Sequence, residues 1–118
     1  MPHYLCLIRA GRNAMGCLSP EGTQNHVEKV GKFIQSMYAS GRMKAAQPLE
    51  MNGVLLAGSQ GKFQETQLGR APEGVAGYYL MEADDLEEAV SLAKSDPRFD
   101  DNGWTMEIRP VMKVEGIS

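Results

Sequence analysis

Long hydrophobic runs are missing from this chain of 118 residues. A helix needs about 20 consecutive apolar residues to cross a bilayer, and no stretch approaches that length. The start, Met1-Pro2-His3-Tyr4, also lacks the basic segment, the apolar segment and the small-residue cleavage site of a signal peptide. We therefore expect a cytoplasmic protein with no membrane partner.

Basic residues, cysteines and histidines are also scarce. Lys and Arg number 12 against 15 Asp and Glu, and this balance lacks the positive footprint that binds nucleic acid. Two cysteines without an export signal, Cys6 and Cys17, are expected to be free thiols. With only two histidines beside them, the chain offers no metal-ligand spacing, and it contains no Gly-x-Gly-x-x-Gly, Walker loop or nucleophile elbow. The sequence predicts no metal, no cofactor and no nucleic-acid partner.

The residues that are present have the composition of an ordinary globular protein. Apolar residues make up 42% and charged residues 23% of the chain, far from the values of disordered chains. The length is that of one domain with a real core. We predict a single domain over residues 1–118.

Alternating strand and helix patterns run along the chain. A helix over about 20–40 begins at Ser19-Pro20 and ends at Gly41, and a second helix begins at Asp84 or Asp85 and ends before Pro97. Exposed loop residues are expected at 68–74. The predicted strands cover residues 4–9, 43–48, 54–57, 62–67, 75–83 and 104–114, with 54–67 forming a hairpin. The order β-α-β-β-β-α-β predicts an α+β, ferredoxin-like sheet with both helices on one face.

Both helices have an apolar stripe at spacings of three and four residues. The predicted core-facing residues are Val27, Val30, Ile34, Met37 and Tyr38 in the first helix and Leu86, Ala89, Val90 and Ala93 in the second.

Neither face of the central strands is polar. In the first strand Cys6 and Ile8 point to one side and Leu5 and Leu7 to the other, and 75–83 repeats this pattern. The pattern leaves open whether Tyr78 or Tyr79 faces the helices. Two helices can cover only one face, so we predict that the second face meets a partner sheet in a homodimer. A small-molecule ligand is expected in a cavity beside that interface.

Several polar residues are candidates for binding or chemistry. His26, in the first helix, is a candidate acid–base catalyst, the alternative being a partly exposed helix histidine, and His3 is a weaker candidate. Glu107 and Arg109 share one face of the last strand, and with Arg9 they are candidates to bind a carboxylate ligand. An ion pair at an edge or between subunits is the alternative. Glu65, in the hairpin, is either a pocket acid or an exposed residue.

Several segments carry a resemblance to a known family. They include Ser19-Pro20-Glu21 with Gln24 and His26, Gln47-Pro48-Leu49-Glu50, Gly61, Phe63 and Glu65-Thr66, the stretch Gly77-Tyr78-Tyr79-Leu80-Met81-Glu82-Ala83-Asp84-Asp85-Leu86-Glu87-Glu88-Ala89, and Glu107-Ile108-Arg109-Pro110-Val111. With these the chain resembles the YCII-related family, specifically its DGPF-domain branch. It departs where that branch reads Asp-Gly-Pro-Phe, because Gln60-Gly61-Lys62-Phe63 stands here, and the 68–74 loop looks longer than usual.

The resemblance implies a dimeric α+β barrel. Relatives in the wider family resemble muconolactone isomerase in fold, and an enzymatic His–Asp pair is implied for them. His26 matches the position of that histidine, whereas the sequence does not identify the aspartate. We therefore predict a dimeric small-molecule-binding protein or an isomerase- or lyase-like acid–base enzyme, with Arg9 or Arg109 holding a small anionic or aromatic metabolite. The alternative is a non-catalytic interaction or regulatory module that uses the second sheet face only for assembly.

Overall fold

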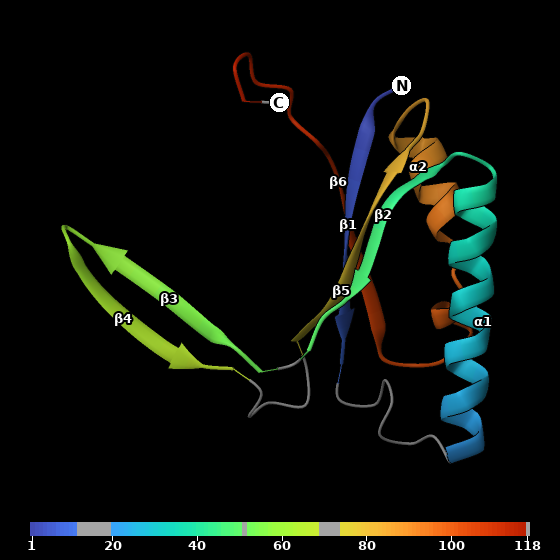
Figure 1. The fold of residues 1–118 in the computed structure, drawn as a ribbon, viewed down its shortest axis with the longest axis horizontal. Coiled ribbons are helices and arrows are strands. Elements are labelled where there is room, and N and C mark those ends of the chain that lie inside the picture. Colours follow the sequence, from blue (N-terminus) through green and yellow to red (C-terminus); the bar gives the residue numbers. More distant parts are fainter. Residues whose placement is uncertain (12–19, 51, 69–73, 118) are drawn as a thin grey trace.

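The computed structural model describes residues 1–11, 20–50, 52–68 and 74–117 (Figure 1). Six strands and two α-helices match the six predicted strand segments and the two predicted helices, and their order is β-α-β-β-β-β-α-β, with one strand more between the helices than the order β-α-β-β-β-α-β states. Their bounds are β1 His3–Ala10, α1 Pro20–Ala39, β2 Met43–Pro48, β3 Val54–Ser59, β4 Lys62–Gln67, β5 Gly74–Glu82, α2 Leu86–Ala93 and β6 Trp104–Pro110, with a short 3-10 helix η1, Pro97–Asp100, before the last strand.

Four of the strands form one antiparallel sheet in the order β2-β5-β1-β6. Both α-helices lie on one side of this sheet (Figure 1). This is the predicted α+β, ferredoxin-like arrangement. The central strand β1 aligns Leu7 with Tyr78 of β5 and with Glu107 of β6, so segments far apart in sequence meet on one surface.

The core lies between the sheet and the helices. Cys6, Tyr79 and Met81 are fully buried there, and Phe33 and Met37 of α1 pack onto them. Tyr79 therefore faces the helices, which answers the question that the strand pattern left open. Burying a large apolar side chain stabilises a fold by about 1.5–3 kcal/mol, so this layer supplies much of the stability.

The predicted stripe of α1 is partly wrong. Val27 is 56% and Tyr38 47% exposed, and the buried face instead runs through His26, Val30, Phe33 and Met37. The spacing of four, three and four residues is that of a helix face turned by about one position from the predicted one. Burial of His26 was not predicted, because a polar residue at the edge of an apolar stripe carries no signal of its own.

The second helix and the last strand also differ in detail from those predicted from the sequence. Asp85, one of the two predicted caps, is the N-cap and accepts a hydrogen bond from the Glu88 backbone N–H. Leu86 is exposed, so its predicted core position is wrong. The last strand ends at Pro110 rather than 114. Pro110 pairs with Tyr4, close to the start of β1, so β1 offers no further residues for strand pairing beyond this point.

The hairpin of β3 and β4 forms a sheet of its own, here called the arm. A two-residue turn with positive φ at Gln60 and Gly61 closes its tip. The Leu68 N–H donates to the Gly53 carbonyl at 2.9 Å and closes its base. The arm extends away from the sheet on the side opposite the helices (Figure 1).

Some predictions fall outside the described residues. They concern Ser19, Cys17 and most of the 68–74 loop. Cys6 is a free, buried thiol, as predicted. Within the described ranges, no helix combines the length and the apolar character that crossing a membrane requires.

Candidate functional site

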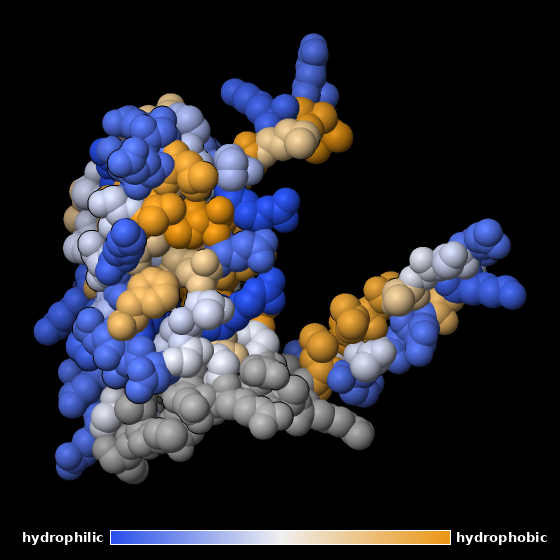
Figure 2. Space-filling view, turned by 180° about the vertical axis from the view of Figure 1, so that it is seen from behind, coloured by the Kyte–Doolittle hydropathy of each residue, from blue (hydrophilic) through white to orange (hydrophobic). Residues whose placement is uncertain are grey.

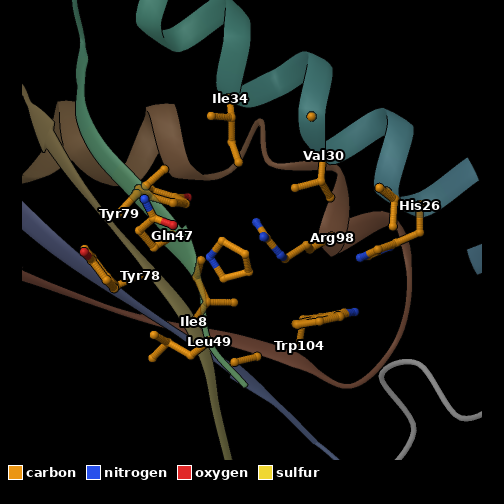
Figure 3. Close-up of a pocket in the computed structure, with 15 residues that line it drawn as sticks. Ile8, His26, Val30, Ile34, Gln47, Leu49, Tyr78, Tyr79, Arg98 and Trp104 are labelled. Carbon is orange, nitrogen blue, oxygen red and sulfur yellow. The ribbon is translucent and has the colours of Figure 1, made fainter. Parts of the chain in front are cut away.

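A cavity of about 540 Å³ lies between α1 and the helix-covered face of the sheet (Figure 3). Aliphatic side chains such as Ile8, Val30 and Ile34 form much of its wall, and His26, Arg98 and Trp104 group together beside them. This volume is in the range of small-molecule sites, which combine apolar walls with a few placed polar groups.

The ring of His26 lies within hydrogen-bond distance of the Asp101 carboxylate. The Nδ1 atom of His26 lies 3.0 Å from Oδ2 of Asp101, and only 6% of His26 is exposed. A carboxylate beside Nδ1 favours the tautomer that carries its proton there, which leaves Nε2 free to accept one. The sequence did not identify an aspartate beside His26, and the structure places Asp101 there.

Trp104 contacts both His26 and Arg98 through its indole ring. The His26 ring stacks on it with centroids 5.4 Å apart and an angle of 14°. The Arg98 guanidinium carbon lies 5.7 Å from the indole centroid, within cation–π range. Because β6 anchors Trp104 in the sheet, the indole restricts the orientations of both neighbours.

The buried carboxylate of Asp96 holds Arg98 in place. Nη1 of Arg98 lies 2.7 Å from Oδ2 of Asp96, and the Arg98 backbone N–H donates to Oδ1 of Asp96 at 2.9 Å. Asp96 is 1% exposed and also accepts a hydrogen bond from the Tyr79 hydroxyl at 3.4 Å. These contacts fix the start of η1, where Asp96 is the N-cap, and direct Arg98 into the cavity wall.

The remaining buried groups near Asp96 are unsuited to be nucleophiles. Burial, aided by the Asp96 charge, raises the pKa of Cys6 from 9.0 to about 12. Burial and the same carboxylate raise the pKa of Tyr79 well above its usual range. Both side chains are therefore protonated at neutral pH.

The other predicted residues do not line this cavity. Arg9, Glu107 and Arg109 lie on the opposite face of the sheet, where Arg9 Nη2 is 3.3 Å and Arg109 Nη1 is 3.8 Å from the Glu107 carboxylate. Glu65 is exposed on the arm. His3 pairs with Glu82 at 3.0 Å, and its hydrogen bond helps to lower the pKa of that carboxyl.

Sequence reasoning missed Asp96, Arg98, Asp101 and Trp104 as site residues. The segment between α2 and β6 was interpreted only as a turn followed by a strand. One signal was available: in a ferredoxin-like sheet the last strand lies beside the first, and a turn that enters the sheet there comes close to the helix following the first strand. The acidic and basic residues of that turn were therefore candidates to meet His26.

The fold and the site together define a ferredoxin-like α+β protein with a buried histidine and a partly buried aspartate paired at an apolar cavity. The family model of the YCII-related domain matches residues 3–115, and the chain belongs to this family. Among solved structures, it is similar to 5-chloro-2-hydroxyhydroquinone dehydrochlorinase from Burkholderia phenoliruptrix AC1100 in complex with 2,5-dihydroxybenzoquinone. The identity is 11%, the TM-score is 0.52 and the match covers 96% of each chain, which shows a shared fold. No curated protein matches the chain.

Proposed function

We propose that this protein is an acid–base enzyme of the isomerase or lyase type, acting on a small anionic aromatic or quinone-like metabolite. The observation that carries the proposal is the His26–Asp101 pair in the wall of an apolar cavity that also contains Arg98. A buried, oriented imidazole beside an apolar space is the arrangement that proton transfer at a bound ligand requires.

In this proposal His26 takes the proton and Asp101 positions it. Nε2 accepts a proton from a carbon or hydroxyl of the ligand, and the resulting imidazolium is stabilised by the Asp101 carboxylate 3.0 Å away. The same Nε2–H then returns the proton to another atom of the ligand or to a leaving group. The protonation state of Asp101 does not change during the cycle.

Arg98 and Trp104 define the class of substrate. The guanidinium favours a carboxylate or an ionised hydroxyl, while the aliphatic wall and the indole favour a flat apolar body. Because Asp96 offsets part of the Arg98 charge, a singly charged ligand suits the cavity better than a phosphate. Support also comes from the structural neighbour, whose bound 2,5-dihydroxybenzoquinone is a small quinone of this kind.

We also propose that the protein is a homodimer of the DGPF-domain branch. Leu5, Leu7 and Leu80 lie half-buried on the sheet face that no described helix covers. A second copy is an economical cover for such a face. The cytoplasmic location stays a prediction.

The test combines binding and proton transfer. Purified protein is titrated with 2,5-dihydroxybenzoquinone and with benzoate while its melting temperature and the ligand absorbance are followed. A specific ligand raises the melting temperature, because it binds only the folded state. Arg98→Gln is expected to weaken binding at least tenfold, about 1.4 kcal/mol, whereas Arg9→Gln, on the other face, is expected to leave it unchanged.

Proton transfer is then followed as exchange of ligand hydrogens in D₂O. His26→Gln is expected to retain binding and lose exchange. Equal exchange by wild type and His26→Gln with a ligand that binds would remove the acid–base role. The exposed arm favours a second candidate, an assembly or regulatory module, and failure of every ligand to bind would support it.

A further inference from the structure

The arm exposes apolar side chains with nothing of its own chain to cover them among the described residues. Every residue from Val54 to Gln67 is exposed, including Leu56 at 60% and Phe63 at 73%. In Figure 2 the hydrophobic side chains of the arm stand in the open, apart from the body. An isolated two-stranded hairpin is at best marginally stable in water, so an apolar arm of this kind points to a binding partner.

One face of the arm concentrates the largest apolar groups around a single charge. Cross-strand pairing places Leu56 opposite Glu65 and Phe63 opposite Gly58, all on one face with Val54. The Phe63 ring lies over Gly58 so closely that a Cβ there would come within 2.7 Å of it. Glu65 makes no ion pair with any residue that the structure describes. The face is therefore apolar with one unpaired carboxylate.

The uncovered face of the sheet has the complementary character. Its centre is aliphatic, with Leu5 and Leu7 half-buried, and its rim holds Arg9, Glu107 and Arg109. Both arginines share the one Glu107 carboxylate, so two positive charges and one negative charge leave this group with a net charge of +1. Arg109 is 72% exposed and available to a further carboxylate.

We infer that the arm of each chain packs against the uncovered sheet face of a second copy, with Glu65 beside Arg109 of the partner subunit. The arm and this face lie on the same side of one chain (Figure 1), so a two-fold axis makes both contacts twice. Strands of six residues extend about 20 Å, twice the ~10 Å spacing of stacked sheets, so the arm is long enough to reach the partner. This inference rests on the proposed homodimer and adds which surfaces form it.

The test uses charge reversal and mixing. Dimer dissociation is measured by sedimentation velocity for wild type, Glu65→Arg, Arg109→Glu and an equal mixture of the two variants. Each variant alone places like charges together at both copies of the contact, so its dimer should dissociate roughly tenfold more readily. In the mixture each heterodimer sets the arginine introduced in one chain against the glutamate introduced in the other, and it keeps the native pair at the second contact. The mixture should therefore recover the wild-type affinity.

Matched controls separate the contact from the change in net charge. Glu50→Arg and Lys113→Glu make the same charge changes at exposed positions outside the two faces, and they are expected to leave dimerisation unchanged. Variants that match their controls would overturn the arm contact while leaving the homodimer intact. Weakening without recovery in the mixture would also overturn it, because only a contact between chains is restored by mixing. A wild-type protein that is monomeric at micromolar concentration would overturn both the contact and the homodimer, without bearing on ligand binding.

Discussion

The same strands form both faces of the sheet, yet the two α-helices cover only one of these faces. On the helix side Tyr79 and Met81 are fully buried, whereas on the other side Leu5 and Leu7 keep part of their surface exposed. The cavity, His26 and Arg98 belong to the completed face, and Arg9 and Arg109 belong to the open one. The two helices thus complete one side of the sheet, where the cavity lies, and leave the other side without a covering helix among the described residues (Figure 1).

The neighbouring tyrosines of β5 provide the strongest contrast between the faces. Tyr79→Ala is expected to lower the free energy of unfolding by about 3–5 kcal/mol, because it leaves a cavity in the core and removes one of the hydrogen bonds that the buried Asp96 accepts. Tyr78→Ala, on the open face, is expected to cost less than half as much in the isolated chain. Urea denaturation of both variants at a fixed protein concentration measures the difference, and equal losses would contradict the assigned faces.

The two histidines test whether the chemistry belongs to the helix side alone. His26→Gln is expected to lower the rate of ligand proton exchange by about 100-fold or more, the usual contribution of a general base. His3→Gln serves as the control, since His3 pairs with Glu82 outside the cavity. Proton exchange with a ligand found by the binding screen is the readout, and comparable rates in the two variants would argue against the proposed role of His26.

Alkaline pH should weaken the helix side selectively. The folded pKa values of Cys6 and Tyr79 lie above their unfolded values of 9.0 and 10.0, so both groups release protons more readily when unfolded. Their stabilising contribution is present below about pH 9 and decreases as the pH rises through about 12. Unfolding free energies between pH 8 and 11 should therefore decline, and the double variant Cys6→Ala, Tyr79→Phe should decline less. An unchanged slope would show that other groups cause the loss.

Neighbouring valines of α1 give the smallest expected effect and the finest test of its orientation. Val30 is 8% exposed and Val27 is 56% exposed. Val30→Ala should cost about 1–2 kcal/mol of stability and Val27→Ala less than about 0.5 kcal/mol. Thermal unfolding with both variants at the same concentration measures this, and comparable losses would support the stripe predicted from the sequence, which includes both valines.

Local rules predicted most of the elements. The Asp85 cap, Pro20 at the start of α1 and the turn at Gln60-Gly61 each act through their own backbone, and each lies where the pattern predicted it. The alternation of β1 also predicted two faces that both need cover. His26 was singled out as a candidate and lines the cavity, but its burial was not predicted, and the cavity was expected beside the dimer interface rather than on the helix side of the sheet.

The site itself depends on contacts between distant segments. His26 and Asp101 are 75 positions apart, and the sheet order that brings α1 beside the turn before β6 is not encoded by the spacing of either residue. The same holds for Arg98 on Trp104, and for the choice of Tyr79 over Tyr78 as the buried tyrosine. By itself the sequence determined most of the elements, the α+β class and the apolar character of both sheet faces, because those follow from periodicity and turn chemistry. Tertiary structure decided which polar residues meet and which face they share, because packing, unlike propensity, acts across the whole chain.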